Sequence, residues 1–298
     1  MTVPATAPAP KLRDRLRRWA PLRIVCFVAA LILVLTLVSM AARALIPPAP
    51  SGLHLHLLMA KNLAGAAAML GVYALLVRAL EHRHAREVDI RRGAGPLVVG
   101  LLVGAGLMGA VYLVLWALGL AQFEAGGGWA GIDAGLVAAF ATAIFEELLL
   151  RAVLFRILEE IGGTTAAVIL SALTFGALHG ANPGATPFSM LAIAIEAGIL
   201  LALAYALTRN LWLAVGIHMG WNFTEGSIFG AEVSGSREAH SLLSAPLTGP
   251  DILTGGAFGP EASVVSLGAC LIVAAVLAVM IRHRGGWRRA RFRLRRSR

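Results

Sequence analysis

Long apolar runs separated by short polar segments extend through most of the chain. A helix that crosses a bilayer needs about 20 mostly apolar residues. Eight stretches approach or exceed this length, at residues 22–46, 57–80, 96–120, 132–158, 164–179, 188–207, 211–229 and 262–281. In the third, Gly100-x-x-x-Gly104 is typical of close helix packing. The pattern predicts an all-α, polytopic membrane protein with about eight transmembrane helices.

The first stretch follows a basic segment, as the apolar part of a signal peptide would. Ala42, Arg43 and Ala44 also resemble a signal-peptide cleavage site. The apolar part of a signal peptide has about 7–15 residues, however, and this run is longer. We therefore expect a retained membrane helix, preceded by a disordered basic segment at residues 1–21.

Lysine and arginine are distributed unevenly among the segments between the apolar stretches. They are frequent before residue 22, between residues 81 and 95, and after residue 281, whereas the alternate segments contain few. Since basic residues are enriched in cytoplasmic loops, this distribution and an even number of spans place both termini in the cytoplasm. The expected organisation is a basic N-terminal segment (1–21), one membrane domain (22–281) and a basic cytoplasmic tail (282–298).

Composition agrees with a membrane location. Of the 298 residues, 58% are hydrophobic and 14% are charged, whereas about 25% are charged in a typical soluble domain. These values argue against an ordinary soluble enzyme and against a disordered chain. The net charge of +10 arises mainly on the predicted cytoplasmic side, where contact with anionic lipid explains it and no nucleic-acid partner is expected. Cys26 and Cys270 lie in apolar runs, which supports neither a disulfide framework nor a CxxC zinc site.

The fourth stretch contains charged residues where a membrane span should have none. Ionisable groups inside spans are costly and usually face the interior of a helix bundle or a wet cavity. Glu146 and Glu147 are adjacent and are followed by Arg151. Because Glu147 and Arg151 are four residues apart, they share a helix face and can pair, which leaves Glu146 without a local cation. Glu146 is therefore a candidate general acid or base. The structural alternative is an ion-pair cluster that joins two helices.

Three further spans carry polar groups. The fifth ends in Phe175 and His179, which share a helix face, and the seventh contains His218 and Asn222, again four residues apart. Interhelical packing or hydrogen bonding also explains each pair. Glu196 in the sixth span has three interpretations that the sequence leaves open: a proton-relay acid, a buried neutral acid, or the partner of a histidine.

If these groups share one cavity, two schemes of peptide-bond hydrolysis are open. In the first, Glu146 and one histidine activate water, while the second histidine and Asn222 stabilise the oxyanion. In the second, Glu146, His179 and His218 bind a zinc ion, which lowers the pKa of its bound water. The chain contains neither an HExxH nor a GxSxG motif, and no phosphate-binding glycine loop.

The polar groups form three motifs, which are Glu146-Glu147-x-x-x-Arg151, Phe175-x-x-x-His179 and His218-x-x-x-Asn222. In this order, these EExxxR, FxxxH and HxxxN motifs resemble the CAAX-protease and bacteriocin-processing family of intramembrane proteases. The resemblance covers residues 132–229, which we expect to be the protease core.

The resemblance implies an eight-helix fold and an intramembrane endopeptidase. It implies that Glu146 activates water with help from His179, and that His218 and Asn222 stabilise the oxyanion. The remaining motif residues take supporting roles: Glu147, Arg151 and Phe175. The family is often described as metalloproteases, yet a metal-free glutamate mechanism has also been argued for it. A zinc cofactor and a metal-free site therefore both stay open.

A composition rich in alanine, arginine and glycine is typical of a bacterium with high GC content, which predicts a multi-pass protein of the inner membrane. Prenylated CAAX substrates are not expected there, so leader peptides and the termini of membrane proteins are the candidate substrates. Two other functions are considered: a non-enzymatic immunity or binding protein of the same family, and a proton-coupled transporter. Glu196 and the intramembrane histidines suggest the transporter, but transporters often contain internal repeats and none is evident here.

Overall fold

The computed structural model describes residues 19–46, 52–237 and 240–290. Its α-helices are α2 (Ala20–Leu45), α3 (Gly52–Leu76), α4 (Ala94–Ala117), α5 (Ile132–Glu147), α6 (Arg156–Leu178), α7 (Pro187–Ile193), α8 (Leu200–Thr208), α9 (Leu211–Asn222), α10 (Asp251–Thr254) and α11 (Val264–His283). Four π-helical segments extend or join them, namely η1 (Val77–Glu81), η4 (Leu148–Phe155), η6 (Ala194–Ile199) and η7 (Phe223–Ile228).

Short 3-10 helices and strands occupy the connecting loops. The 3-10 helices are η2 (Arg86–Val88), η3 (Ile90–Arg92), η5 (His179–Ala181), η8 (Gly256–Phe258) and η9 (Pro260–Ala262). Strand β1 (Glu124–Ala125) pairs antiparallel with β4 (Leu243–Ser244), and β2 (Glu232–Val233) pairs antiparallel with β3 (Ser236–Arg237). The fold is thus helical, and its strands only tie loops together.

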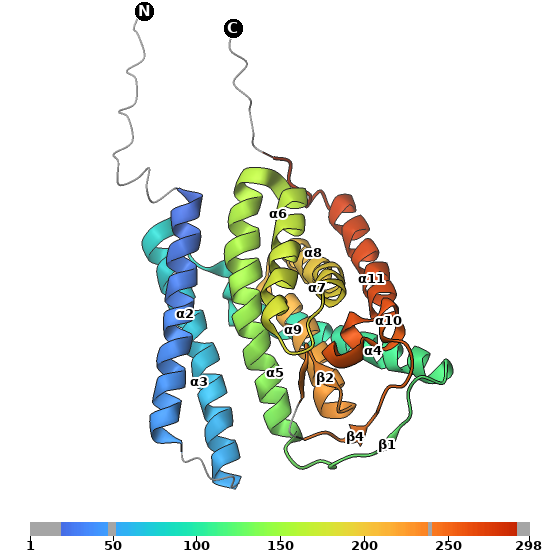
Figure 1. The fold of residues 1–298 in the computed structure, drawn as a ribbon. Coiled ribbons are helices and arrows are strands. Elements are labelled where there is room, and N and C mark those ends of the chain that lie inside the picture. Colours follow the sequence, from blue (N-terminus) through green and yellow to red (C-terminus); the bar gives the residue numbers. More distant parts are fainter. Residues whose placement is uncertain (1–18, 47–51, 238–239, 291–298) are drawn as a thin grey trace, which may run out of the picture.

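Every apolar stretch identified in the sequence coincides with a helical segment. Five segments are long and apolar enough to cross a membrane: Ala20–Leu45, Leu53–Glu81, Ala94–Ala117, Pro187–Thr208 and Val264–His283. An all-α polytopic membrane fold is therefore confirmed. The count of eight spans and the cytoplasmic location of both termini stay predictions. In Figure 1, α2 begins and α11 ends on the same side of the molecule, as an even number of spans requires.

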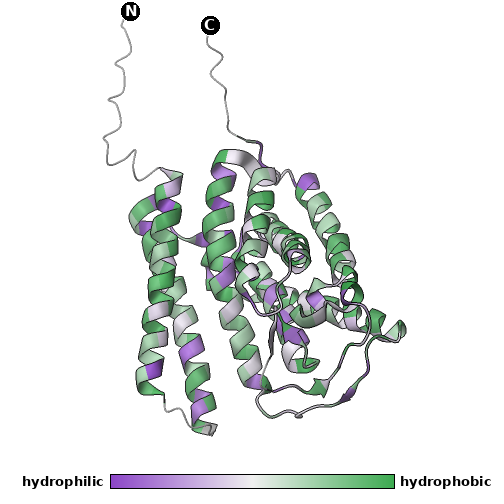
Figure 2. Ribbon diagram, in the orientation of Figure 1, coloured by the Kyte–Doolittle hydropathy of each residue, from purple (hydrophilic) through white to green (hydrophobic). Residues whose placement is uncertain are grey.

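Helix α9 lies at the centre of the bundle. Each residue from Leu211 to Trp221 is buried, and α4, α5 and α8 pack around this helix. Helices α2 and α3 form a hairpin at one flank (Figure 1). Figure 2 shows that the outer helices α2, α3 and α11 are largely apolar, and large apolar side chains such as Leu33 and Ile272 are exposed on them. A surface of this kind suits contact with lipid.

Glycines bring α4 and α9 into close contact. A Cβ added at Gly104 would lie 2.0 Å from the carbonyl oxygen of Ile217, so no larger residue fits there. Gly100 on the same face meets the backbone of α9 in the same way. In return, a Cβ at Gly216 or Gly220 would lie 2.3 Å from a carbonyl oxygen of α4. This contact between two backbones sets the depth and the rotation of α9 in the bundle.

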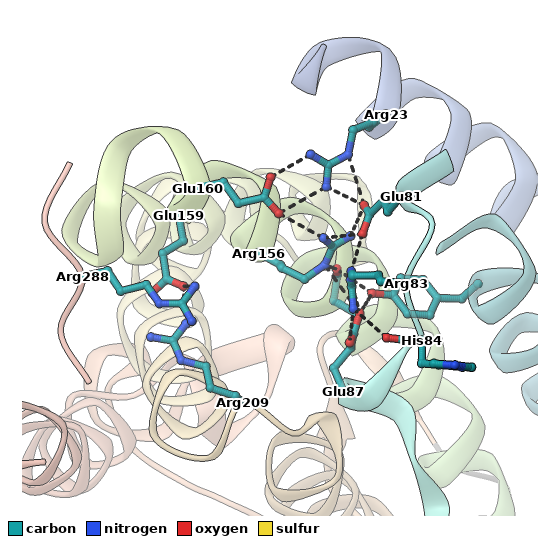
Figure 3. A network of polar contacts seen from close by, with 12 residues as sticks. Arg23, Glu81, Arg83, His84, Glu87, Arg156, Glu159, Glu160, Arg209 and Arg288 are labelled. Carbon is teal, nitrogen blue, oxygen red and sulfur yellow. Dashed lines mark hydrogen bonds and ion pairs between the residues drawn. The ribbon is translucent and has the colours of Figure 1, made fainter. Parts of the chain in front are cut away.

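Charged side chains, some of them buried, join helices at the end of the molecule where α2 begins (Figure 3). Glu81 at the end of η1 pairs with Arg23 of α2 at 2.5 Å and with Arg156 of α6 at 2.8 Å. Arg23 also pairs with Glu160 at 2.7 Å. A second cluster, in which Glu159 pairs with Arg209 and Arg288, brings in the end of α8 and the segment that follows α11.

Gly163 interrupts α6 with a φ of 73° and a ψ of 177°. The kink falls between the predicted spans 132–158 and 164–179, so these two spans are separated by a bend. The C-terminal segment packs against it, because the Arg288 backbone N–H donates to Thr164 Oγ1 at 2.9 Å and its carbonyl accepts from the Thr164 N–H at 3.0 Å. Part of the predicted tail (282–298) therefore contacts α6. Residues 291–298 of this tail, and residues 1–18 of the N-terminal segment predicted to be disordered, lie outside the described residues.

Candidate active site

A cavity of about 250 Å³ lies among α5, α6, η6 and α9. Five of the residues singled out in the three motifs line it: Glu146, Phe175, His179, His218 and Asn222. These residues come from three separate apolar stretches of the sequence. Helix packing therefore brings together side chains that the motifs alone place only on their own helices.

Both histidines direct a ring nitrogen toward the same carboxylate oxygen. His179 Nε2 and His218 Nε2 each lie 3.9 Å from Glu146 Oε2. This oxygen is buried and has no hydrogen-bond partner among the described residues. A distance of 3.9 Å is too long for a hydrogen bond, but a single water molecule can bridge such a gap.

The other ring nitrogen of each histidine contacts an acceptor that fixes the tautomer. His179 Nδ1 lies 2.8 Å from the carbonyl oxygen of Phe175, one helical turn earlier. His218 Nδ1 lies 3.0 Å from Glu147 Oε1. Because a carbonyl and a carboxylate oxygen accept hydrogen bonds, Nδ1 is the donor in both rings. In a neutral ring, Nε2 is then an unprotonated acceptor that faces Glu146.

Glu147 and Arg151 form a fully buried pair, as their i,i+4 spacing predicts. Arg151 Nη1 donates to Glu147 Oε1 at 3.0 Å. Its Nη2 donates to the carbonyl oxygens of Ala197 at 3.1 Å and Gly198 at 3.3 Å in η6. The guanidinium also lies 4.8 Å from the centre of the Phe175 ring. Arg151 thus links Glu147, whose carboxylate contacts His218, to η6 and to the Phe175 ring of the FxxxH motif.

Three π-helical segments adjoin the cavity. Segment η4 follows Glu147 directly, η7 follows Asn222 directly, and η6 contains Glu196. A π-helix inserts an extra residue into a helical turn, and such insertions occur frequently at functional sites. The motifs did not predict these insertions, because EExxxR and HxxxN are compatible with an ordinary α-helix.

The cavity also contains acids that sequence reasoning did not assign to the site. Glu196 and Glu261 line it, and Glu225 on η7 accepts a hydrogen bond from the Glu261 backbone N–H at 3.3 Å. Burial raises the pKa of the Glu261 carboxyl. Glu225 lies inside the predicted span 211–229, so an acid in an apolar run was the available signal. Glu261 lies in a connecting loop, where acids are ordinary, and gave no such signal.

Glu196 pairs with no histidine in the described part of the chain. Its side chain is only 1% exposed, yet it forms part of the cavity wall. Of the three interpretations left open by the sequence, the described residues therefore do not support the third, in which Glu196 pairs with a histidine.

As placed in the structure, Glu146, His179 and His218 lie farther apart than the ligands of a bound zinc ion would. Tetrahedral zinc has ligands at about 2.0–2.2 Å, which places neighbouring ligand atoms about 3.4 Å apart. Here both distances between Nε2 and Oε2 are 3.9 Å. Across the described ranges, no group of three or more His, Cys, Asp or Glu residues has an arrangement that would bind a metal ion. Zinc binding would require these side chains to move closer together.

Residues 128–224 match the family model for "Type II CAAX prenyl endopeptidase Rce1-like" proteins. The match comprises 97 of the 298 residues and includes the three motifs. It confirms the family resemblance over this part of the chain. No match was found among curated proteins or among solved structures.

Proposed function

We propose that this protein is an intramembrane endopeptidase that hydrolyses a peptide bond with water activated by Glu146. The observation that carries the proposal is the convergence of His179 Nε2 and His218 Nε2 on Glu146 Oε2, each at 3.9 Å, in the wall of one cavity. The match to an endopeptidase family over residues 128–224 supports the same reaction class.

Water activation follows from this geometry. A water molecule that donates to Glu146 Oε2 also reaches the unprotonated Nε2 of His179, so both groups orient it. Glu146 takes the proton as the water oxygen forms a bond to the substrate carbonyl carbon. When the C–N bond then breaks, Glu146 returns the proton to the departing amine. Water is thus consumed, and a carboxylic acid and an amine are released.

Oxyanion stabilisation falls to Asn222 and His218. The amide of Asn222 can donate in any protonation state of the site. His218 donates through Nδ1 to Glu147, so its Nε2 can donate to an oxyanion only when the ring is protonated. The carboxylate of Glu147 stabilises this imidazolium form electrostatically. Glu147 and Arg151, which do not line the cavity, therefore stabilise the charge and position of His218, and Phe175 positions His179 from the cavity wall.

The substrate class follows from the location of the site. The cavity lies within a helical membrane fold, so the substrate is a peptide or protein segment that reaches it from the membrane or its surface. In a bacterial inner membrane, leader peptides and the termini of membrane proteins fit this description. Lipid surrounds the outer helices, and no nucleic-acid partner is expected.

The proposal is tested by comparing peptides released from membranes of cells that express the wild-type protein or one of three variants, Glu146→Gln, His179→Ala and His218→Ala. We expect each variant to abolish the new chain termini that the wild type generates, while immunoblots show equal protein. Asp133→Asn is the matched control, because it makes the same change from carboxylate to amide at an exposed position of α5.

Two results bear on competing assignments. Unchanged chain termini in all three variants would contradict the proposal. If Glu146→Gln also protected cells fully against a bacteriocin, the assignment as a non-enzymatic immunity protein would replace the endopeptidase.

Metal analysis of the purified protein, combined with cleavage assays with and without a chelator, compares the two schemes of water activation. The metal-free scheme, in which Glu146 itself takes the proton, predicts no loss of cleavage with the chelator.

A further inference from the structure

Three carboxylates that the proposed reaction does not use gather at the same cavity. Glu196 and Glu261 line it together with Glu146, and Glu225 contacts the backbone of Glu261. Their exposed fractions are 1% for Glu196, 0% for Glu225 and 3% for Glu261. They come from η6, η7 and η9, so three separate segments of the fold contribute to the cluster.

Each of two of these carboxylates has one oxygen that the described residues leave without a partner. Glu196 Oε2 and Glu225 Oε2 are buried and have no hydrogen-bond partner within residues 19–46, 52–237 and 240–290. No lysine or arginine whose side chain the structure describes pairs with any of the three acids. Of these two residues, only Glu196 lines the cavity, so its unpartnered carboxyl oxygen is the one that a ligand in the cavity can reach.

The polar groups that do face the cluster are few. Ser234 Oγ donates to Glu261 Oε1 at 2.5 Å, and the charges of His179 and His218 act on Glu261. Glu225 and Glu261 share a side-chain hydrogen bond, which requires a proton on one of the two carboxyls, and the charge of Glu261 also acts on Glu196. Like charges in a buried site disfavour ionisation of all three acids unless a cation binds among them. The arrangement is therefore suited to a positively charged ligand.

The nature of that ligand follows from the rest of the cavity. No group of three or more described His, Cys, Asp or Glu residues has the arrangement of a metal site, and the apolar part of the cavity wall favours an organic cation over a bare ion. Apolar side chains adjoin the acids in the cavity wall, among them Ile193, Leu200 and Leu201. Lysine and arginine combine an apolar stem with a charged tip. The stem of one such side chain can pack against the apolar residues of the wall while its charged tip binds the acids. Since Glu146 lines the same cavity, this side chain belongs to the substrate whose peptide bond is cleaved.

We infer that Glu196 and Glu261, backed by Glu225, form an acidic subsite that binds a lysine or arginine side chain of the substrate close to the scissile bond. This inference rests on the proposed endopeptidase function and specifies its substrate class. The substrate is a peptide segment with a basic residue beside the bond that is hydrolysed. Glu196 and Glu261 are thus specificity-determining residues, distinct from the groups that activate water.

A binding experiment tests the subsite without requiring cleavage. The probes are two fluorescent peptides of alanine and leucine that differ only at one central position, lysine in one and norleucine in the other. Their affinities are measured by fluorescence anisotropy for the full-length Glu146→Gln protein in lipid nanodiscs, which we expect to leave the peptides intact. We expect at least tenfold tighter binding of the lysine peptide. Adding Glu196→Gln should reduce this ratio to about one, and adding Asp133→Asn should leave it unchanged.

The outcomes separate the subsite from the reaction. Equal affinities of the two peptides for the Glu146→Gln protein would overturn the subsite, and so would a preference that persists in both the Glu196→Gln and the Glu261→Gln double variants. The same peptides are then offered to the wild-type protein. If the wild type cleaves the peptides but the lysine peptide does not bind more tightly, the endopeptidase function is supported and the subsite is contradicted. A lysine preference in binding without cleavage of either peptide would support the subsite and contradict the endopeptidase.

Discussion

In the proposed reaction, the side chains at the cavity divide into those that contact the substrate and those that position them. His179 is oriented by a backbone carbonyl of its own helix, whereas His218 is oriented by the carboxylate of Glu147. The hydrogen bond to His179 uses a backbone atom, although the Phe175 ring also stacks on His179 with ring centres 4.6 Å apart, whereas the hydrogen bond to His218 depends on the side chain of one residue. Glu147 is therefore the positioning residue whose replacement is most informative.

Replacing Glu147 by glutamine keeps the size of the side chain and an oxygen that can accept from His218 Nδ1, but it removes the charge. The protonated form of His218 then loses its electrostatic partner, so we expect kcat to fall by about 10- to 100-fold, with KM changed less than threefold. Steady-state kinetics on the purified variant measures this split. A rise in KM with kcat unchanged would show that Glu147 acts on substrate binding instead.

The residues of the three motifs could be recognised in the sequence because charged and histidine side chains are conspicuous in apolar runs. Their meeting in one cavity could only be hypothesised, because spacing along a helix does not specify which helices are neighbours. Glu261 is the clearest example of a cavity residue that the sequence alone does not reveal. It lies in a loop about 115 residues after Glu146, and only the folded chain brings both to one cavity.

Individual helices place the site through backbone contacts as well as through side chains. The Gly100-x-x-x-Gly104 motif predicts close packing of one helix, and the structure identifies its partner as α9, which carries Gly216 and Gly220 on either side of His218. The sequence could not name this partner, because the motif has no information on what packs against it. The π-helical segments are likewise a product of tertiary packing.

Gly104→Leu should disrupt the contact between α4 and α9, because any Cβ at this position meets a carbonyl oxygen at 2.0 Å. We expect the midpoint of thermal unfolding in detergent to fall by at least about 5 °C, since overpacking costs about 1–3 kcal/mol or more. Gly106→Leu is the matched control on the same helix, because an added Cβ there meets nothing within 4 Å. Equal midpoints for the two variants would contradict this account of the interface.

On the scale of the whole molecule, the ion-pair clusters of Figure 3 connect the α2–α3 hairpin to α6 at the end where α2 begins. Hydropathy and the distribution of arginine predicted the helical membrane fold and which segments are basic. They did not predict that the segment after α11 folds back onto the kink at Gly163. That contact depends on the backbone of Arg288, which bonds to the backbone N–H and the hydroxyl of Thr164, and the pattern of residue types does not reveal this pairing.

Stability should depend on pH through Glu87, which lies in the loop between α3 and α4. Burial opposes its ionised form, but hydrogen bonds from Arg83 and Tyr73 hold the pKa of Glu87 below its ordinary value. The unfolded chain, with a glutamate pKa of about 4.3, then binds a proton first as the pH falls. Stabilisation by Glu87 is thus present above this value and lost below it.

Thermal unfolding between pH 6 and pH 3.5 tests this dependence. We expect the midpoint of the wild type to fall more steeply with decreasing pH than that of Glu87→Gln, whose side chain does not titrate. Asp133→Asn, at an exposed position, should follow the wild type. If the unfolding midpoints of the wild type and Glu87→Gln change in parallel with pH, Glu87 does not contribute to the pH dependence of stability.

In the proposed reaction, Glu146 activates the water that cleaves the peptide bond. The most direct measurement is the initial rate of cleavage of one peptide by purified Glu146→Gln protein in liposomes, beside the Asp133→Asn control. We expect a rate at least about 1,000-fold below that of the control, with both proteins folded and unfolding at similar temperatures. A Glu146→Gln rate within tenfold of the control would contradict the claim.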